Sequence, residues 1–237
     1  MTFEGASTVT TEGDGSHAIY SYGTNSVITL GNATTLSTSG TDAYSIYGYA
    51  GKITGTGKFT LGTVTKSEAI VARNAIVDLN MNNASYFNGY SNITGTGKIN
   101  INMSQGSTWK LSQSSKLSSI HVASASTIVF TIDAQDDYRF ITADEAVLNN
   151  SVIKVVLGSY NPVLNDEFIL ILSSDISGSD LSFDFSEAIL QNGLMWDTST
   201  FLTDGTIRII GAVPEPLAIS AIFGLLALGA VRLRRKN

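Results

Sequence analysis

Tyrosine is the residue type in this chain whose spacing best suits ligand binding. Tyr20 and Tyr22 lie two positions apart, and Tyr44, Tyr47 and Tyr49 form a second group further along the chain. If these side chains point outward from strands, their rings form an aromatic ladder that can stack on sugars. Inward packing explains the same spacing equally well, because aromatic side chains also fill cores. Which interpretation holds depends on the direction in which the strands face.

Residues that usually carry catalysis or bind metals are few. His17 and His121 are the only histidines and lie far apart in the sequence, so we interpret each as an exposed or packed side chain. Asp133, Asp136 and Asp137 offer the oxygen ligands that Ca²⁺ prefers. The EF-hand spacing and the calcium-binding nonapeptide are absent, so a solvated acidic loop is favoured. The sequence therefore predicts no cofactor, no metal site and no enzymatic activity.

A hexapeptide ending in Gly-Thr-Gly-Lys occurs twice, at Ile53–Lys58 and Ile93–Lys98. A phosphate-binding loop needs an upstream glycine and a hydroxyl residue after the lysine. Both copies lack these residues, with Lys52 and Asn92 at the glycine positions and Phe59 and Ile99 at the hydroxyl positions. We therefore predict turns that open strands, with glycines at positive φ. The chain also has no GxSxG elbow and no HExxH pair.

The C-terminal end of the chain has three parts in a defined order. A Val-Pro-Glu-Pro motif precedes the apolar run 217–231, and basic residues follow. As a helix this run is about 22 Å long, and bilayer thinning together with arginines that extend to the interface can match it to a bilayer. Apolar side chains surround the helix on every side, which predicts a transmembrane helix rather than a buried core helix. The motif is Val213, Pro214, Glu215 and Pro216, and the membrane stop is Arg232, Arg234, Arg235 and Lys236.

This arrangement resembles the PEP-CTERM sorting signal of Gram-negative bacteria. The resemblance implies that an exosortase removes the tail, so that an inner-membrane precursor becomes a cell-surface or extracellular protein. Since positive charge stays on the cytoplasmic side, residues 1–211 are expected outside the membrane. Such export needs an N-terminal signal, but residues 1–18 have neither a basic start nor an apolar core. We therefore expect the sequence to be incomplete at its start.

Composition restricts the partners of the exported part. Of the 20 acidic and 14 basic residues, Glu215 and the four cations of the membrane stop lie beyond residue 211. The remaining 19 acidic and 10 basic residues give a net charge of −9. Such a surface repels nucleic acid and anionic lipid. Cysteine is absent, which excludes a disulfide framework and thiolate metal sites.

Internal repeats and alternating hydrophobicity predict an all-β fold. Residues 18–23 are echoed by residues 43–48, and the two hexapeptides repeat at a different step, so the rungs must vary in length or loops must intervene. Short strands with one buried face and glycine-rich turns favour a repetitive parallel β-helix over residues 1–132. A β-sandwich or irregular barrel is the main alternative. The region resembles the β-helical passenger repeats of autotransporter-like proteins. The alternation is seen at Phe59 and Leu61; Val77, Leu79 and Met81; Ile99, Ile101 and Met103; and Ile128, Phe130 and Ile132.

From residue 133 the strands become longer and more hydrophobic. This change predicts a β-rich cap over residues 133–211, which would cover the open end of the solenoid. Trp196 and Phe201 are expected in the core of that cap. Residues 212–237 form the third part of the chain, the sorting signal with its membrane helix.

The leading functional hypothesis is an exported structural or adhesive protein of the cell surface or extracellular matrix. The resemblance to PEP-CTERM proteins implies an association with exopolysaccharide and biofilm material. One alternative is a polysaccharide-binding or polysaccharide-degrading β-helix protein. Degradation would need clustered carboxylates or cations, and the cations Lys52, Lys58, Arg73, Lys98 and Lys110 form no obvious cluster.

A second alternative is ice binding, because this kind of signal is also found on ice-binding proteins. It would require a flat array of outward threonines at constant register. Threonine does repeat in the two hexapeptides, but the glycines between the threonines look like turns. The residues concerned are Thr54, Thr56, Thr94 and Thr96.

Overall fold

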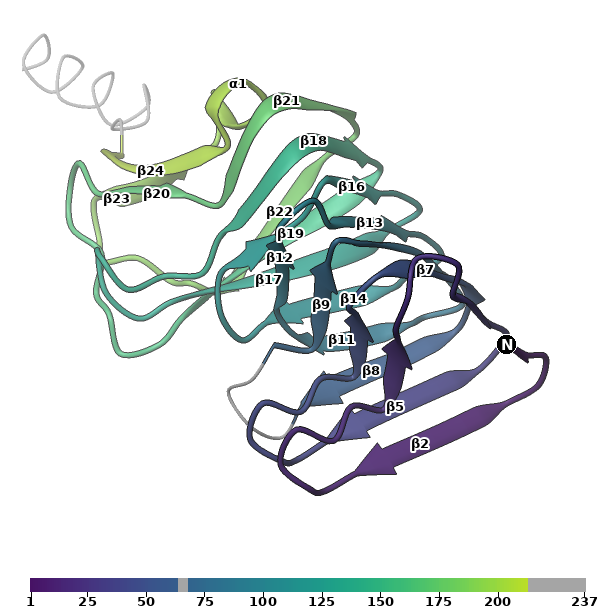
Figure 1. The fold of residues 1–237 in the computed structure, drawn as a ribbon. Coiled ribbons are helices and arrows are strands. Elements are labelled where there is room, and N and C mark those ends of the chain that lie inside the picture. Colours follow the sequence, from purple (N-terminus) through teal and green to yellow (C-terminus); the bar gives the residue numbers. More distant parts are fainter. Residues whose placement is uncertain (64–67, 213–237) are drawn as a thin grey trace, which may run out of the picture.

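The chain forms a parallel β-helix, in which each turn of the coil adds strands to the same sheets (Figure 1). The computed structural model describes residues 1–63 and 68–212. The predicted all-β solenoid is confirmed. The Val213–Pro216 motif, the predicted membrane helix 217–231 and the basic residues up to Lys236 lie outside the described residues. Within the described ranges, no helix is long and apolar enough to cross a bilayer.

Two large sheets run along the coil, and every pairing within them is parallel. Sheet A consists of β1 (Thr2–Phe3), β4 (Val27–Leu30), β7 (Gly51–Gly57), β10 (Ala75–Met81), β13 (Lys98–Met103), β15 (Ser115–Lys116), β16 (Ser119–Val122), β18 (Ile141–Asn149) and β21 (Ile171–Ser179). Sheet B consists of β2 (Ser7–Thr11), β5 (Thr34–Thr38), β8 (Phe59–Thr63), β11 (Tyr86–Gly89), β14 (Thr108–Leu111), β17 (Ser126–Ile132), β19 (Ser151–Leu157) and β22 (Ser182–Glu187).

A third parallel sheet is shorter and lies in the N-terminal and middle rungs. Sheet C consists of β3 (Ile19–Ser21), β6 (Ile46–Gly48), β9 (Ile70–Arg73) and β12 (Ser91–Thr94). In the rungs that include sheet C, one turn of the coil therefore passes through a strand of A, a strand of B and a strand of C in that order.

The core lies between the sheets and is formed by every second residue of the strands. In β10, the side chains of Val77, Leu79 and Met81 are fully buried, whereas Ile76 and Asn80 on the other face are exposed. The predicted alternation of buried and exposed residues is confirmed in β8 and β13 as well; in β17 the predicted inward residues are buried, but Val129 between them is also covered. Each rung buries its apolar side chains against the rungs above and below, which is how solenoids are stabilised.

The length of a turn varies along the coil, as the unequal repeat steps predicted. Tyr20 pairs with Tyr47, 27 residues later, whereas Ile101 pairs with Ile120, 19 residues later. The pairing step of Tyr20 differs from the step between the similar segments 18–23 and 43–48. Matching those segments by sequence places Tyr20, which points outward, against Ser45, which is buried. The number of residues per turn thus varies through the length of the loops between the sheets, whereas the register between paired strands stays regular.

The coil continues past residue 133, where the sequence suggested a separate cap. Strands β18 and β21 extend sheet A, and β19 and β22 extend sheet B. The boundary expected between residues 132 and 133 therefore falls within the solenoid. The sequence composition changes at residue 133 because the rungs that follow have longer strands, not because a new structural unit begins.

A small antiparallel sheet covers the C-terminal end of the coil (Figure 1). It contains β20 (Glu167–Ile169), β24 (Thr206–Gly211) and β23 (Leu194–Asp197), and the short helix α1 (Phe201–Asp204) precedes β24. Phe168, Ile207 and Phe201 are buried beneath it. Trp196 is partly buried and packs against this core. The predicted core position is confirmed for Phe201, whereas Trp196 lies at the margin of the core.

The first copy of the repeated hexapeptide, Ile53–Lys58, lies in a strand. Residues up to Gly57 belong to β7, so the predicted strand-opening turn is wrong here. Of the two glycines only Gly57 has a positive φ, of 143°. Gly55 points inward, where a Cβ would lie 2.6 Å from the Phe59 ring. Glycine at position 55 therefore makes room for a core phenylalanine.

The second copy, Ile93–Lys98, adopts a different conformation. It ends β12 at Thr94, turns, and opens β13 at Lys98, so the predicted turn is confirmed for this copy. Gly95 has φ of 62°, and the backbone N–H of Thr96 donates to Asn74 Oδ1 over 2.9 Å. The same six residues thus form a strand or a turn according to the neighbouring rung.

Candidate functional site

The tyrosines singled out in the sequence gather on the outer face of sheet C. In β3 and β6 the isoleucines Ile19 and Ile46 point inward and are buried. Because side chains alternate along a strand, Tyr20 and Tyr47 point outward. We call the cluster of Tyr20, Tyr22, Tyr44, Tyr47, Tyr49 and His17 the aromatic face.

Aromatic rings on this face stack across adjacent rungs in three pairs. Tyr20 stacks on Tyr47 with ring centroids 5.3 Å apart, and Tyr22 stacks on Tyr49 at 5.2 Å. His17 stacks on Tyr44 at 4.8 Å, with the ring planes only 7° apart. All three pairs join residues 27 positions apart, which is the rung step at Tyr20 and Tyr47. Strand register therefore produces the stacking.

Exposure of the aromatic face decides between the two interpretations of the tyrosine spacing. Tyr20 is 47% exposed and Tyr22 is 69% exposed, so the N-terminal members of their pairs have open ring surface. Tyr47 is partly covered because Tyr44 and Tyr49 meet it edge-on, with centroids 5.3 Å and 6.3 Å away. The side chains form an outward ladder, not a core.

Beside the tyrosines the surface is hollowed and polar. The hollow has a volume of about 440 Å³ and is lined by Tyr44, Tyr47, Glu68, Arg73 and Asn92, among others. Asn92 Nδ2 donates to Glu68 Oε1 over 3.4 Å. Strand β9 supplies Arg73 and β12 supplies Asn92, so the hollow lies on the rungs that follow the tyrosines. Aromatic surface and hydrogen-bonding groups thus adjoin on one face.

Charge on this face is limited and held in place. The Arg73 guanidinium carbon lies 5.1 Å from the centroid of the Tyr49 ring, a cation–π contact. Burial, together with the charge of Glu68 and a hydrogen bond to it, raises the pKa of Tyr90 to about 12. Burial lowers the pKa of His17, whose Nδ1 accepts a hydrogen bond from the backbone N–H of Tyr44. The imidazole is therefore neutral at pH 7, and the rings around it form an uncharged surface.

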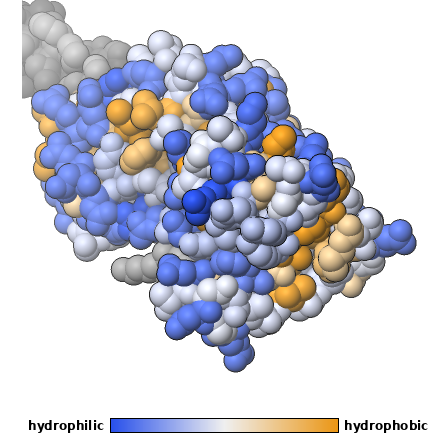
Figure 2. Space-filling model, in the orientation of Figure 1, coloured by the Kyte–Doolittle hydropathy of each residue, from blue (hydrophilic) through white to orange (hydrophobic). Residues whose placement is uncertain are grey.

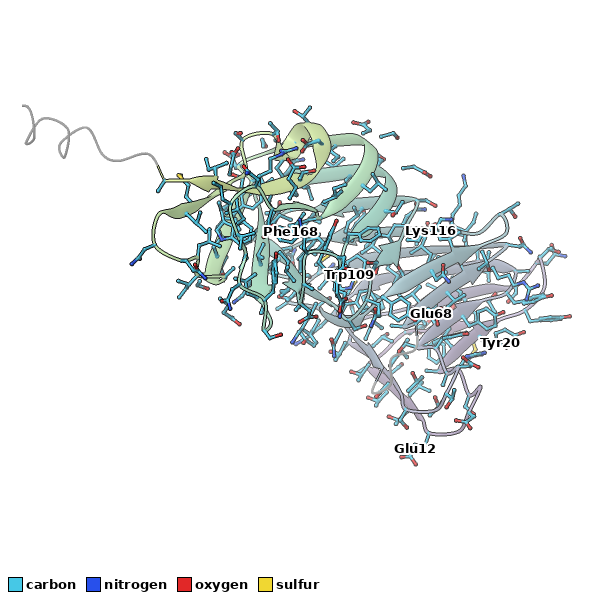
Figure 3. The ribbon with its side chains drawn as sticks, turned by 90° about the vertical axis from the view of Figure 1, so that its left-hand side faces the viewer. Glu12, Tyr20, Glu68, Trp109, Lys116 and Phe168 are labelled. Atoms are coloured by element: carbon cyan, nitrogen blue, oxygen red, sulfur yellow. The ribbon has the colours of Figure 1, made fainter. Side chains whose placement is uncertain are left out.

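Figure 3 places these residues along the molecule. Tyr20 and Glu68 lie in the N-terminal and middle rungs, Trp109 lies near the middle of the coil, and Phe168 lies in the C-terminal part. Comparison with protein families, with curated proteins and with solved structures finds no match.

The other candidate residues from the sequence do not come together. His121 Nε2 lies 3.3 Å from Glu145 Oε2 on sheet A, away from His17. Asp133 and Asp137 both pair with Arg139, at 3.1 Å and 2.6 Å, so an arginine neutralises part of the acidic loop. In residues 1–63 and 68–212, no group of three or more histidine, aspartate or glutamate side chains could hold a metal ion.

Basic side chains are distributed over different faces. Lys52 pairs with Asp78 at 3.0 Å on sheet A, Lys110 lies on β14 of sheet B, and Arg73 lies on sheet C. Lys154 pairs with Glu187 at 2.6 Å on sheet B. The hollow beside the tyrosines could not be found from the sequence, since Asn92 comes from the rung after that of Glu68 and Arg73 and the three residues have no common spacing.

Sheet B carries a second feature that the sequence did not reveal. Threonines from successive rungs lie in one outward column: Thr8, Thr35, Thr60, Thr108 and Thr127, with Tyr86 between the third and fourth. Neighbouring strands lie about 4.7–4.9 Å apart, so this is a regular row of hydroxyl and methyl groups. Each threonine comes directly before an inward apolar residue, a signal that could have been used. The threonines of the hexapeptides do not join this column, because Thr54 lies on sheet A and Thr94 on sheet C.

Proposed function

We propose that this chain is a non-catalytic scaffold of the cell surface or extracellular matrix that binds polysaccharide through the aromatic face. The observation that carries this proposal is the stacking of three aromatic pairs in register, with Tyr20 and Tyr22 open to solvent. Aromatic rings with one face exposed offer flat apolar surface to the C–H faces of a sugar ring. A long solenoid presents such surface without moving parts.

The hollow beside the tyrosines supplies the polar half of the same site. Binding sites for small polar ligands combine aromatic walls with a few placed hydrogen-bonding groups. Glu68 and Asn92 offer an acceptor and a donor for sugar hydroxyls, and Arg73 adds further donors. The excess of acidic residues disfavours nucleic acid and strongly anionic polymers as partners. The proposed ligand is therefore a neutral polysaccharide.

Anchoring belongs to the same proposal. The tail resembles a PEP-CTERM signal, so we propose an exosortase as processing partner and an inner-membrane precursor in a Gram-negative bacterium. Strand β24 ends at Gly211, two residues before the Val213–Pro216 motif. The folded body therefore ends close to the motif, and only a short segment separates the scaffold from the predicted membrane helix 217–231.

Binding is tested by affinity electrophoresis of the full chain through gels that contain neutral or acidic polysaccharides. The proposal expects retardation by a neutral polymer, with no release of reducing ends after prolonged incubation. Tyr86→Ala is the control for substitutions in the aromatic face, because Tyr86 is an exposed tyrosine that lies on sheet B, outside that face. Release of reducing ends, lost when one carboxylate is removed, would instead support the degrading alternative.

Sorting is tested in a host that carries the matching exosortase. Glu215→Gln and Pro214→Ala should each cause uncleaved precursor to accumulate in the membrane, because proline and glutamate define an extended, charged recognition element. Intact mass of the released protein is the measurement. Normal trimming of both variants would remove the sorting role from the motif.

Ice binding is the second candidate function, and the threonine column of sheet B favours it. Rows of hydroxyl and methyl groups at strand spacing give a flat, regular surface. Inhibition of ice recrystallisation by the full chain is the measurement, and Thr60→Lys is the variant that should abolish it. The interruption at Tyr86 and the neighbouring Lys110 count against this function, and for that reason polysaccharide binding is preferred.

A further inference from the structure

Exposed apolar side chains gather where the described chain leaves the antiparallel sheet. Val163, Leu164, Ile189 and Met195 are all exposed, and Ile189 is 82% exposed. We call these four residues the exit patch. Figure 2 shows apolar surface among hydrophilic neighbours over this end of the molecule. Exposed apolar groups that gather in one place commonly mark an interaction surface.

Strand pairing brings Val163, Leu164 and Met195 to the same end of the sheet, and the hydrogen bond from Trp196 Nε1 to the Ala188 carbonyl places the adjoining Ile189 beside β23. Leu194 lies opposite Gly211, the last residue of β24. On the other side of β24, the backbone N–H of Asn165 donates to the carbonyl of Ile209 over 3.0 Å. The turn that carries Val163 and Leu164 and the turn that leads into β23 therefore flank the same end of β24. This is the end from which the chain continues toward residue 213.

The turn that carries Leu164 is held in its conformation by a buried carboxylate. Asp166 is 2% exposed, and its Oδ2 accepts a hydrogen bond from the backbone N–H of Val163 over 2.7 Å. The same oxygen accepts a hydrogen bond from the Tyr160 hydroxyl, also over 2.7 Å. Together with the hydrogen bond from the Asp166 N–H to the Val163 carbonyl, these contacts fix the turn in a conformation in which Val163 and Leu164 are exposed.

Chain length limits how far this edge can lie from a bilayer. The predicted membrane helix begins at Leu217, five residues after Ala212. Five residues span at most about 18 Å when fully extended. The headgroup region on each side of the hydrocarbon core is itself roughly 5–8 Å thick. An anchored chain therefore holds this end of β24 within about 10–13 Å of the lipid surface, and in contact with it when the five residues are not fully extended.

We propose that the exit patch inserts into the lipid–water interface of the bilayer that holds the C-terminal helix. This inference rests on the proposed membrane anchoring and adds a second contact between protein and membrane. The apolar tips of the two turns enter the headgroup and acyl boundary, in the way that exposed apolar side chains of peripheral proteins do. The contact fixes the direction in which the solenoid leaves the membrane.

Neutral lipid is sufficient for this contact. Strand β24 contains one cation, Arg208, which pairs with Glu167 at 3.0 Å and with Asp204 at 2.6 Å. Arg208 is therefore already neutralised. Attraction to anionic headgroups needs free basic residues, so insertion depends on apolar burial instead.

The experiment uses the absence of cysteine from the chain. Leu164→Cys and Ile189→Cys are each labelled with an environment-sensitive dye, and the full chain is reconstituted into phosphatidylcholine vesicles. Leu172→Cys is the matched control, since Leu172 is 51% exposed, Leu164 is 52% exposed, and Leu172 lies in β21 beyond the other end of β24. Vesicle flotation first measures anchoring. Quenching by lipids that carry a nitroxide near the headgroup then measures depth.

The inference expects floated protein with strong nitroxide quenching at positions 164 and 189 and little at position 172. Floated protein with equal, weak quenching at all three positions would overturn the inference and leave the anchor intact. Protection of positions 164 and 189 from aqueous iodide without nitroxide quenching would also overturn it, because another protein surface then covers the patch. A chain that does not float would overturn the anchor and the inference together.

Discussion

Aromatic stacks cross the rungs of this solenoid both inside it and outside it. Phe87 and Trp109 stack within the core at 4.8 Å with planes 16° apart. Tyr20 and Tyr47 stack on the outer face of sheet C at 5.3 Å with planes 20° apart. Both pairs join directly opposed residues of parallel strands. The same register therefore produces nearly the same ring geometry in two different environments.

Burial decides what each stack contributes. Phe87 and Trp109 are completely buried, and Trp109 Nε1 donates to the carbonyl of Gly89 over 3.0 Å. Tyr20 keeps almost half of its surface in water, so it gains less from folding and remains able to contact a ligand. Stacking across rungs therefore stabilises the coil where water is excluded, and where it is not excluded it leaves ring surface open for the proposed ligand.

Removal of the inner stack should have the largest effect on stability. Trp109→Ala leaves a cavity beside Phe87 and removes one of the two hydrogen bonds that the Gly89 carbonyl accepts, the other coming from the Ser112 N–H. We therefore expect a loss of about 3–5 kcal/mol in the free energy of unfolding. Urea denaturation of the full chain, followed by circular dichroism, measures it. Polysaccharide binding by the folded protein should not change. A loss below about 1.5 kcal/mol, the range of an exposed aromatic pair, would mean that the two stacks do not differ as proposed.

Removal of the outer stack should instead reduce ligand affinity strongly and stability only slightly. Tyr47→Ala removes the ring on which Tyr20 stacks and one wall of the hollow, so we expect polysaccharide affinity to fall about tenfold or more, which is about 1.4 kcal/mol. Stability should fall by less than about 1.5 kcal/mol. Affinity electrophoresis and urea denaturation on the same samples measure both. Tyr47→Phe keeps the ring and should retain most of the affinity; equal loss in both variants would place the effect on the hydroxyl rather than on the stack.

Much of the inner architecture could be predicted from the sequence because burial leaves a periodic trace. Alternation at Val77, Leu79 and Met81 predicted the strands and their inward face, and unequal repeat steps predicted turns of unequal length. The boundary at residue 133 could not be placed correctly, because longer strands and a new fold give the same change in composition. Only strand pairing distinguishes them.

The outer surface was harder to predict, because the neighbouring rung decides it. The tyrosine spacing left outward and inward packing open, and only the register of β3 and β6 distinguished them. The two identical hexapeptides show the same limit: Gly55 faces the Phe59 ring inside a strand, whereas Gly95 turns against Asn74. Short-range sequence does not encode which neighbour a segment will meet.

A smaller effect is expected at the edge of the aromatic face. Arg73→Ala removes the cation above Tyr49 and donors in the hollow, and an exposed cation–π contact contributes about 0.5–1 kcal/mol. We expect a twofold to fivefold loss of affinity, about that energy, with little change in stability. Among the described residues Arg73 has no ion pair, so no carboxylate is left unpaired by the change. Arg73→Lys keeps the charge, so its affinity should lie between those of the native chain and Arg73→Ala. Unchanged affinity in Arg73→Ala would mean that the hollow is not part of the binding site.

The smallest predicted effect is on the pH dependence of stability. It distinguishes the outer stacks from the inner one, because His17 can titrate and the inner stack has no titratable side chain. Burial among tyrosines lowers the pKa of His17 below its ordinary value of 6.5. The folded state therefore binds the proton less readily than the unfolded chain does, and His17 contributes stability that is present above pH 6.5 and is lost as the pH falls below it. Thermal unfolding at pH 8 and pH 5.5 should show a larger drop in Tm for the native chain than for His17→Gln, which keeps a polar side chain and cannot titrate. Since carboxylates titrate in both proteins, the difference between the two drops isolates the histidine. Equal drops would mean that His17 is no more buried in solution than in an unfolded chain, and the stack with Tyr44 would then be too loose to form one wall of a binding face.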